Sequence, residues 1–155
     1  MPFALKAKLA GRILSLCAQV PAHTVSAMST VLTYLLIGTG SALGGMFRYL
    51  LSTLIDHHER SSFPWGILIV NLIGCLAMGL AFGLIEKTHM KLFFMTGILG
   101  GFTTFSAFSL ITLELAQRGR WDLAGAYIAA SVLGCLVAVW LGFIITTTLK
   151  SAPIQ

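Results

Sequence analysis

The sequence predicts an all-α integral membrane protein with four transmembrane helices, of which the third is broken. Hydrophobic residues make up 57% of the 155 residues and charged residues 10%, and the mean hydropathy is +0.91. These values lie outside the range of soluble globular proteins. The apolar residues form four long blocks separated by short polar segments. The third block contains two adjacent glycines and four hydroxyl residues, which are unusual inside a membrane helix.

Each block is long enough to cross the hydrocarbon core, which takes roughly 20 helical residues. The blocks cover residues 30–55, 64–85, 92–113 and 123–149. They show no alternation of apolar and polar residues, so a transmembrane β-barrel is excluded. The sequence therefore predicts a four-helix membrane domain over residues 30–149, followed by a short tail, residues 150–155.

Residues 1–29 differ from the four apolar blocks in composition. Lys6, Lys8 and Arg12 are interspersed with apolar residues, and Arg12 interrupts the apolar core that a cleaved signal peptide needs. Met28 stands immediately before the first apolar block. We expect either a disordered or surface-lying leader, or a chain whose translation begins at Met28.

The basic residues outside residues 1–29 give the chain no clear orientation in the membrane. One side would carry Lys87, Lys91 and Lys150, and the other Arg60, Arg118 and Arg120. Because topology follows the excess of Lys and Arg in short loops, a balanced chain inserts in both orientations. Two oppositely inserted copies would supply the inverted repeat that larger transporters encode in one chain.

Small residues recur at helix-packing spacing within the spans. They are Gly40 and Gly44, Gly79 and Gly83, and Gly134 with Gly142. Such spacing lets helix backbones approach closely, and it favours a dimer.

The charge pattern excludes two functional classes. The formal net charge is +5, but the basic residues stand singly at helix ends, without the basic stripe of a nucleic-acid-binding protein. They are expected to contact lipid headgroups. The spans hold no acidic or histidine proton relay and no pair of nucleophile and base, so the chain is not expected to be an enzyme.

The third block reads GILGGFTTFSAFS over residues 97–109. Gly100 and Gly101 each weaken a helix by about 1 kcal/mol relative to alanine. Backbone groups released there must be satisfied within protein or in a wet cavity. We therefore expect the third helix to break at the glycines, as helices do at ion sites in transporters.

Polar residues inside membrane spans are costly and point to function. Here they are Arg48, Asn71, Thr103, Thr104, Ser106, Ser109, Tyr127 and Ser131. Each hydroxyl alone is equally compatible with a hydrogen bond to the carbonyl four residues earlier, and Asn71 with an interhelical hydrogen bond. Together, beside a glycine break, they favour a pathway for an ion.

Two pairs of residues have helical spacing. Tyr127 and Ser131 are four apart, and Phe105 and Phe108 are three apart, so each pair shares a helix face. Phenylalanines at this spacing are more often core than site. However, the edge of an aromatic ring is electropositive, and such edges can hold a small anion where no full charge is nearby.

The motifs GSALGGMFRY at residues 40–49, WGILIVNLIG at residues 65–74 and the run at residues 97–109 together resemble the Fluc (CrcB-type) fluoride channels. The resemblance extends over residues 28–149. It implies a dual-topology antiparallel homodimer of four-helix subunits in the cell inner (plasma) membrane. Such a dimer has two fluoride pores and passively exports fluoride that entered as HF.

The resemblance also implies roles for the pore residues. Phe105 and Phe108 match the phenylalanines that contact fluoride edge-on, and Asn71 matches the pore asparagine that orients or binds the ion. Tyr127 and Ser131 match the pore wall of the fourth helix.

Other matches lie beside the pore. Gly100 and Thr103 match residues whose backbone carbonyls, from both subunits, hold a central structural Na⁺, and Arg48 matches a first-helix arginine of structural or vestibular role. Family members often have a threonine and a glutamate where this chain has Ile67 and Ile111. Because of this difference, the sequence does not predict the ion path beyond the phenylalanines or the conduction rate.

Two other functional classes fit four membrane helices. A small dual-topology drug exporter needs an acidic residue in its first span, and residues 30–55 contain none. A non-conducting assembly subunit would explain the glycine packing but not the Thr/Ser run with Asn71. A subunit that works only with a paralogous partner is also left open.

Overall fold

The computed structural model describes residues 30–58 and 63–151. Internal contacts divide the chain into residues 1–32 and residues 33–155. Of the first unit only residues 30–32, which open the first described helix, are described. The predicted leader, residues 1–29, and residues 152–155 of the predicted tail lie outside the described residues.

The described elements are all helical, and the four predicted spans are confirmed. The first is α2 (Thr30–His58), the second α3 (Trp65–Leu84) and the fourth α7 (Trp121–Ser151). The third consists of α4 (Thr88–Met90), the π-helical segment η2 (Lys91–Leu99), α5 (Gly100–Phe102) and α6 (Phe105–Gln117). Together these segments form four helices that are long and apolar enough to cross a membrane, and the third is bent.

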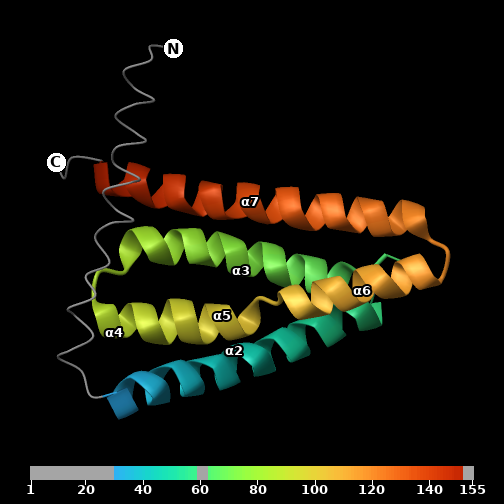
Figure 1. Cartoon of the computed structure of the whole chain (residues 1–155). Helices are drawn as coiled ribbons and strands as arrows, with labels where there is room; N and C mark the ends of the chain where they lie inside the picture. The colour runs from blue at the N-terminus through green and yellow to red at the C-terminus, as the bar shows by residue number, and fades with distance from the viewer. Residues whose placement is uncertain (1–29, 59–62, 152–155) are drawn as a thin grey trace. The chain divides into compact units, whose positions relative to one another are not determined.

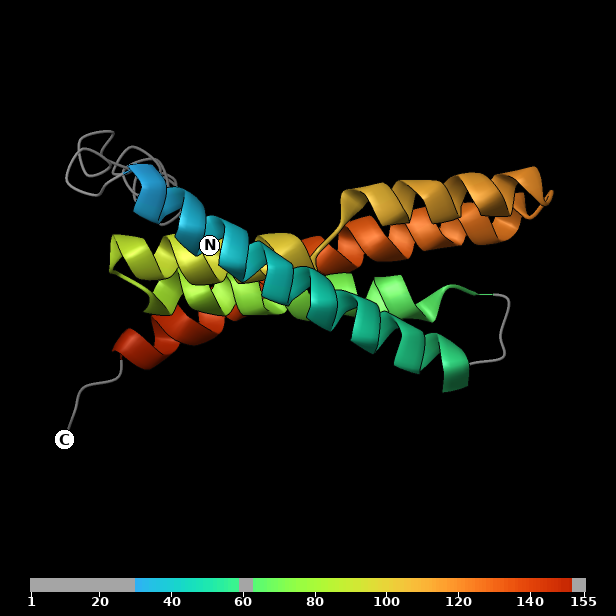
Figure 2. The same cartoon turned by 90° about the horizontal axis from the view of Figure 1, so that it is seen from below.

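Helix α3 occupies the middle of the bundle. It lies along α7 on one side and against η2 on another, whereas α6 packs on α7 (Figures 1 and 2). Helices α3 and α7 run in the same direction, because Leu72 meets Gly134 and Gly83 meets Thr146. Their backbones are in contact: a Cβ at Gly142 would lie 2.9 Å from the backbone nitrogen of Leu80.

The glycines of the first span also serve close packing. A Cβ added at Gly40 would lie 2.9 Å from the Cα of Gly97, and one at Gly44 would overlap the carbonyl of Ile98. The predicted close packing is therefore confirmed, but the glycines are used within one chain. Contrary to our expectation, these spacings give no support to a dimer.

The third helix breaks at Thr103 and Thr104, so the predicted break at the glycines is wrong. Gly100 keeps helical angles, with φ −65° and ψ −36°. Thr103 (φ −82°, ψ 148°) and Thr104 (φ −148°, ψ 123°) are extended. Gly101 instead permits the approach of α2, since a Cβ there would lie 2.5 Å from the carbonyl oxygen of Ser41.

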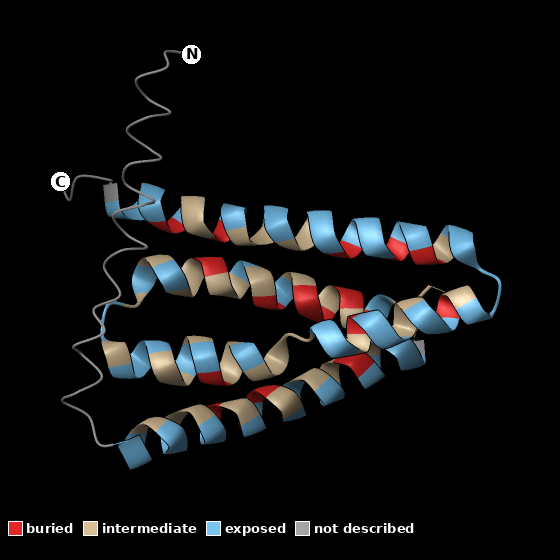
Figure 3. Ribbon diagram, viewed as in Figure 1, coloured by how far each residue is buried: buried red, intermediate tan, exposed pale blue. Residues whose placement is uncertain are grey.

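The surface of the bundle is that of a membrane protein. Buried residues form short patches along the helices (Figure 3), and most of the large apolar side chains are exposed. The described ion pairs lie at helix ends; one joins Lys150 to Glu86 at 2.8 Å. The hydrogen bond and charge of Lys150 hold the pKa of Glu86 below its ordinary value. Both groups are exposed, so this pair contributes little to stability.

We expect Gly79→Ala to destabilise the bundle, because its Cβ would overlap the carbonyl of Val139 on α7. Overpacking of this kind costs about 1–3 kcal/mol. The matched control is Gly125→Ala, whose Cβ meets nothing within 4 Å. Thermal unfolding in one detergent should show a lower midpoint for Gly79→Ala only; equal midpoints would contradict the close α3–α7 contact.

Candidate functional site

The break in the third helix is held by one side chain from α3. Asn71 is 7% exposed, and its Oδ1 accepts a hydrogen bond from the backbone N–H of Thr104 at 2.9 Å. Its Nδ2 donates to the carbonyl of Thr104 at 3.2 Å. The amide thus satisfies both backbone groups of a residue that lies outside the helical ladder. The bond to the Thr104 carbonyl uses one of the two Nδ2 hydrogens.

Thr104 also starts the next helical segment. Its hydroxyl accepts from the backbone N–H of Ala107 at 3.3 Å, which caps α6, and lies 3.1 Å from the hydroxyl oxygen of Ser106. Two other hydroxyls of the run make the hydrogen bond to the backbone carbonyl four residues earlier. Thr103 donates to the carbonyl of Leu99 at 2.9 Å, and Ser109 donates to that of Phe105 at 2.9 Å.

The two phenylalanines of α6 lie together but differ in exposure. The ring centroids of Phe105 and Phe108 are 5.1 Å apart, with the planes at 43°. Phe105 is 76% exposed in the single chain, whereas Phe108 is 8% exposed and stacks on Tyr127 at 5.4 Å. The predicted shared face is confirmed. This helix face carries the exposed ring of Phe105 and the buried ring of Phe108.

Two hydroxyls of α7 are buried and unpaired. Tyr127 is 0% and Ser131 is 5% exposed, and neither hydroxyl oxygen has a hydrogen-bond partner among the described residues. The expected backbone hydrogen bond of Ser131 is therefore not made. A buried O–H without a partner costs about 1–3 kcal/mol, so both groups are available to a water or an anion.

These residues surround one cavity of about 270 Å³. It is lined by Asn71, Cys75, Thr103, Thr104, Phe105, Phe108, Ser131, Val132 and Cys135. The structure therefore brings four of the five predicted pore residues onto one cavity, and the fifth, Tyr127, packs on Phe108. No charged side chain of the described residues lines it.

The remaining predicted residues lie elsewhere. Arg48 is on α2 and does not line the cavity; its Nε is buried without a partner among the described residues. Gly100 precedes the break by one turn, and Thr103 lines the cavity. Ile111 packs against the buried cluster that contains Phe108 and Tyr127.

Sequence reasoning missed two residues of the site. Cys75 was not among the predicted site residues, yet it lines the cavity one turn after Asn71. The signal was available, because residues four apart share a helix face. Thr104 was identified only as one of several hydroxyls, and its pairing with Asn71 joins residues 33 apart in the sequence.

The comparisons with known proteins show the family of the chain. The family model of the CrcB-like proteins, described as camphor resistance (CrcB), matches residues 35–143. The chain belongs to the CrcB/FluC family. This family is one of fluoride channels and not of enzymes.

Three relatives carry the name fluoride-specific ion channel FluC. The one from Paramagnetospirillum magneticum is 46% identical over 77% of this chain and 99% of its own length. The relative from Opitutus terrae is 46% identical over 76% of this chain and 95% of its own length. The one from Rhodospirillum rubrum is 44% identical over 73% and 93%. Within this CrcB/FluC chain, the conspicuous feature is a cavity with hydrogen-bond donors and ring edges but no charge.

Proposed function

We propose that this chain forms a fluoride-selective channel that passively exports fluoride across the plasma membrane. The observation that carries the proposal is the uncharged cavity beside Phe105, in a chain whose near full-length relatives are named fluoride-specific ion channels. Fluoride is small and strongly hydrated, so it enters only where donors replace its water. The donors here are the hydroxyl of Ser131 and the second Nδ2 hydrogen of Asn71, and Tyr127, whose hydroxyl is also unpaired among the described residues, packs on Phe108.

The alternative of a proton-coupled exporter gains no support. The described α2 extends to His58 and includes Asp56 in its last turn. The carboxylate of Asp56 accepts a hydrogen bond from the backbone N–H of Gly66 at 2.9 Å, at the start of α3. It is therefore a link between helix ends and not a carboxylate in the middle of the membrane.

The function is tested with the purified chain in liposomes loaded with potassium fluoride. A fluoride electrode should record rapid efflux once a potassium ionophore lets K⁺ leave together with fluoride, so that no opposing membrane potential builds up. Chloride efflux should be much slower. Protein-free liposomes measure the leak. Absence of fluoride efflux, or equal chloride efflux, would reject the proposal.

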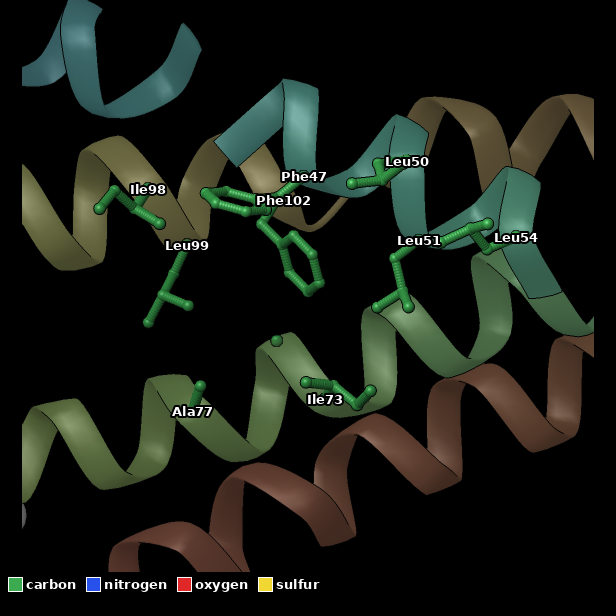
Figure 4. A pocket seen from close by; sticks show the side chains of 10 residues that line it. Phe47, Leu50, Leu51, Leu54, Ile73, Ala77, Ile98, Leu99 and Phe102 are labelled. Carbon is green, nitrogen blue, oxygen red and sulfur yellow. The ribbon is translucent and has the colours of Figure 1, made fainter. Parts of the chain in front are cut away.

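We also propose that two copies pair in antiparallel orientation. An apolar cavity of about 390 Å³ lies between α2, α3 and the η2–α5 segment (Figure 4). Its walls include Phe47, Leu50, Leu54, Ile98 and Phe102. The cavity reaches the break through Phe102 and continues onto exposed apolar residues of α2. A second copy would cover this face, and the balanced basic residues favour opposite insertion.

We expect reporter fusions after Gln155 to be active on both sides of the membrane when translation starts at Met28. The physical reason is the balance of lysines and arginines. Adding two lysines after Gln155 should bias one orientation and lower activity in cells that express this chain alone. A reporter active on one side only would contradict dual insertion of the chain that starts at Met28 and would mean that a paralogous subunit supplies the opposite copy.

We propose, finally, that backbone carbonyls at the break hold a structural Na⁺ between two copies. In an unbroken helix the N–H of Thr104 would donate to the carbonyl of Gly100, but it donates to Asn71 instead. Hard carbonyl oxygens without their helical donors suit a monovalent cation. The carbonyls of Gly100 and Thr103 would hold it, and its charge would attract anions without an ionisable side chain.

Replacing Na⁺ on both sides with a bulky organic cation should lower fluoride efflux, slowly if the site is buried between subunits. Efflux from the same liposomes after Na⁺ is restored is the control, because recovery excludes denaturation. Full efflux after exhaustive removal of Na⁺ would show that the break serves the fold alone.

A further inference from the structure

Two thiols that the proposed transport does not use meet across the α3–α7 contact. Cys75 and Cys135 line the same cavity, are half-buried and form no disulfide. They come from α3 and α7, the two helices that pack along each other beside this cavity. Both lie near the middle of their spans, Trp65–Leu84 and Trp121–Lys150.

The packing of the two helices fixes this pair. On one side of the thiols in the sequence, a Cβ at Gly134 would lie 2.7 Å from Cδ2 of Leu72. On the other side, Gly79 is in backbone contact with Val139. Because the helices touch both before and after the thiols, the two cysteines stay on the same cavity unless the bundle opens.

We propose that Cys75 and Cys135 form a binding site for a soft, two-coordinate divalent cation, of which Hg²⁺ is the type, and that its binding closes the cavity to anions. Two S–H bonds break, two S–Hg bonds form and both protons leave to water, without any electron transfer. Thiolates select soft cations. Two thiolates neutralise a divalent cation, so the complex adds no net charge to the middle of the membrane, where charge is costly.

The surroundings of the pair discriminate against harder cations. Zn²⁺ takes four ligands in most protein sites. Among the described residues, no group of three or more His, Cys, Asp or Glu residues is placed to hold a metal. The nearby Asn71 oxygen already accepts from Thr104. A linear S–Hg–S complex needs no further ligand, so Hg²⁺ should bind far more tightly than Zn²⁺.

Binding is tested on the full chain with Cys17→Ser as the background, because that cysteine would also bind mercury. Titration with mercuric chloride, followed by thiolate–mercury absorbance with a competing monothiol present, should give one Hg²⁺ per subunit. Cys75→Ser and Cys135→Ser should each weaken binding at least about 100-fold, because one of two linked ligands is lost. Excess Zn²⁺ should not compete. Two Hg²⁺ per subunit, or unchanged affinity in either variant, would overturn the site.

The consequence for transport rests on the proposed function and is measured separately. One Hg²⁺ per subunit should stop fluoride efflux from liposomes that contain the Cys17→Ser protein. Each serine variant, compared with its own untreated rate, should be at least tenfold less sensitive. Unchanged efflux with mercury bound would overturn closure of the cavity. Absence of efflux before mercury is added would overturn the proposed function, and the titration would still decide the metal site.

Discussion

Phe105→Ala is expected to lower fluoride efflux at least about tenfold while leaving the fold intact. The ring is 76% exposed in the single chain, so its removal opens no core cavity. What is lost is an aromatic ring that lines the cavity and whose edge is electropositive. A tenfold change in rate corresponds to about 1.4 kcal/mol. Efflux per reconstituted protein, measured with a fluoride electrode, checks the prediction. Phe108→Ile should also reduce efflux, because an aliphatic side chain has no such edge.

The matched control is Phe82→Ala on α3. Phe82 is also an exposed member of an aromatic pair, with its ring 5.9 Å from that of Phe143, but it does not line the cavity. We expect its efflux to equal that of the unmodified chain. Equal efflux in Phe105→Ala and Phe82→Ala would reject ring edges as ligands in this channel.

The spans were predictable from the sequence because their signal is local. Hydrocarbon requires long apolar segments, and the chain contains four with polar residues between them. The helix ends extend a few residues beyond the apolar blocks, as α2 does to His58. The helical spacing of Tyr127 and Ser131 likewise predicted that they share a face, and both are buried.

The position of the break was not predictable in the same way. Glycine weakens a helix intrinsically, but Gly100 and Gly101 remain helical, and Gly101 lies in close contact with α2. The chain leaves the helix where Asn71 offers both an acceptor and a donor to Thr104. That pairing depends on how α3 packs against the third span. Residue propensities carry no information about it.

Asn71→Leu is expected to abolish fluoride efflux and to destabilise the bundle. Leucine has a similar volume but leaves the N–H and C=O of Thr104 without partners in a buried place. Each unsatisfied group costs about 1–3 kcal/mol. Asn71→Asp separates the two effects. Its carboxylate still accepts from the Thr104 N–H but no longer donates, and it places negative charge in a cavity that no cation lines.

We therefore expect efflux to fall at least about 100-fold in Asn71→Asp, because a fixed anion in a low-dielectric cavity repels fluoride by several kcal/mol. The control is Thr146→Val on α7. Thr146 is 0% exposed, and its hydroxyl donates within its own helix to the carbonyl of Phe143 at 2.8 Å, away from the cavity. Loss of a buried polar group there should leave efflux unchanged. The prediction is checked by fluoride efflux, with thermal unfolding measured on the same preparations to show that each variant is folded. Undiminished efflux in a folded Asn71→Asp channel would mean that fluoride does not pass Asn71.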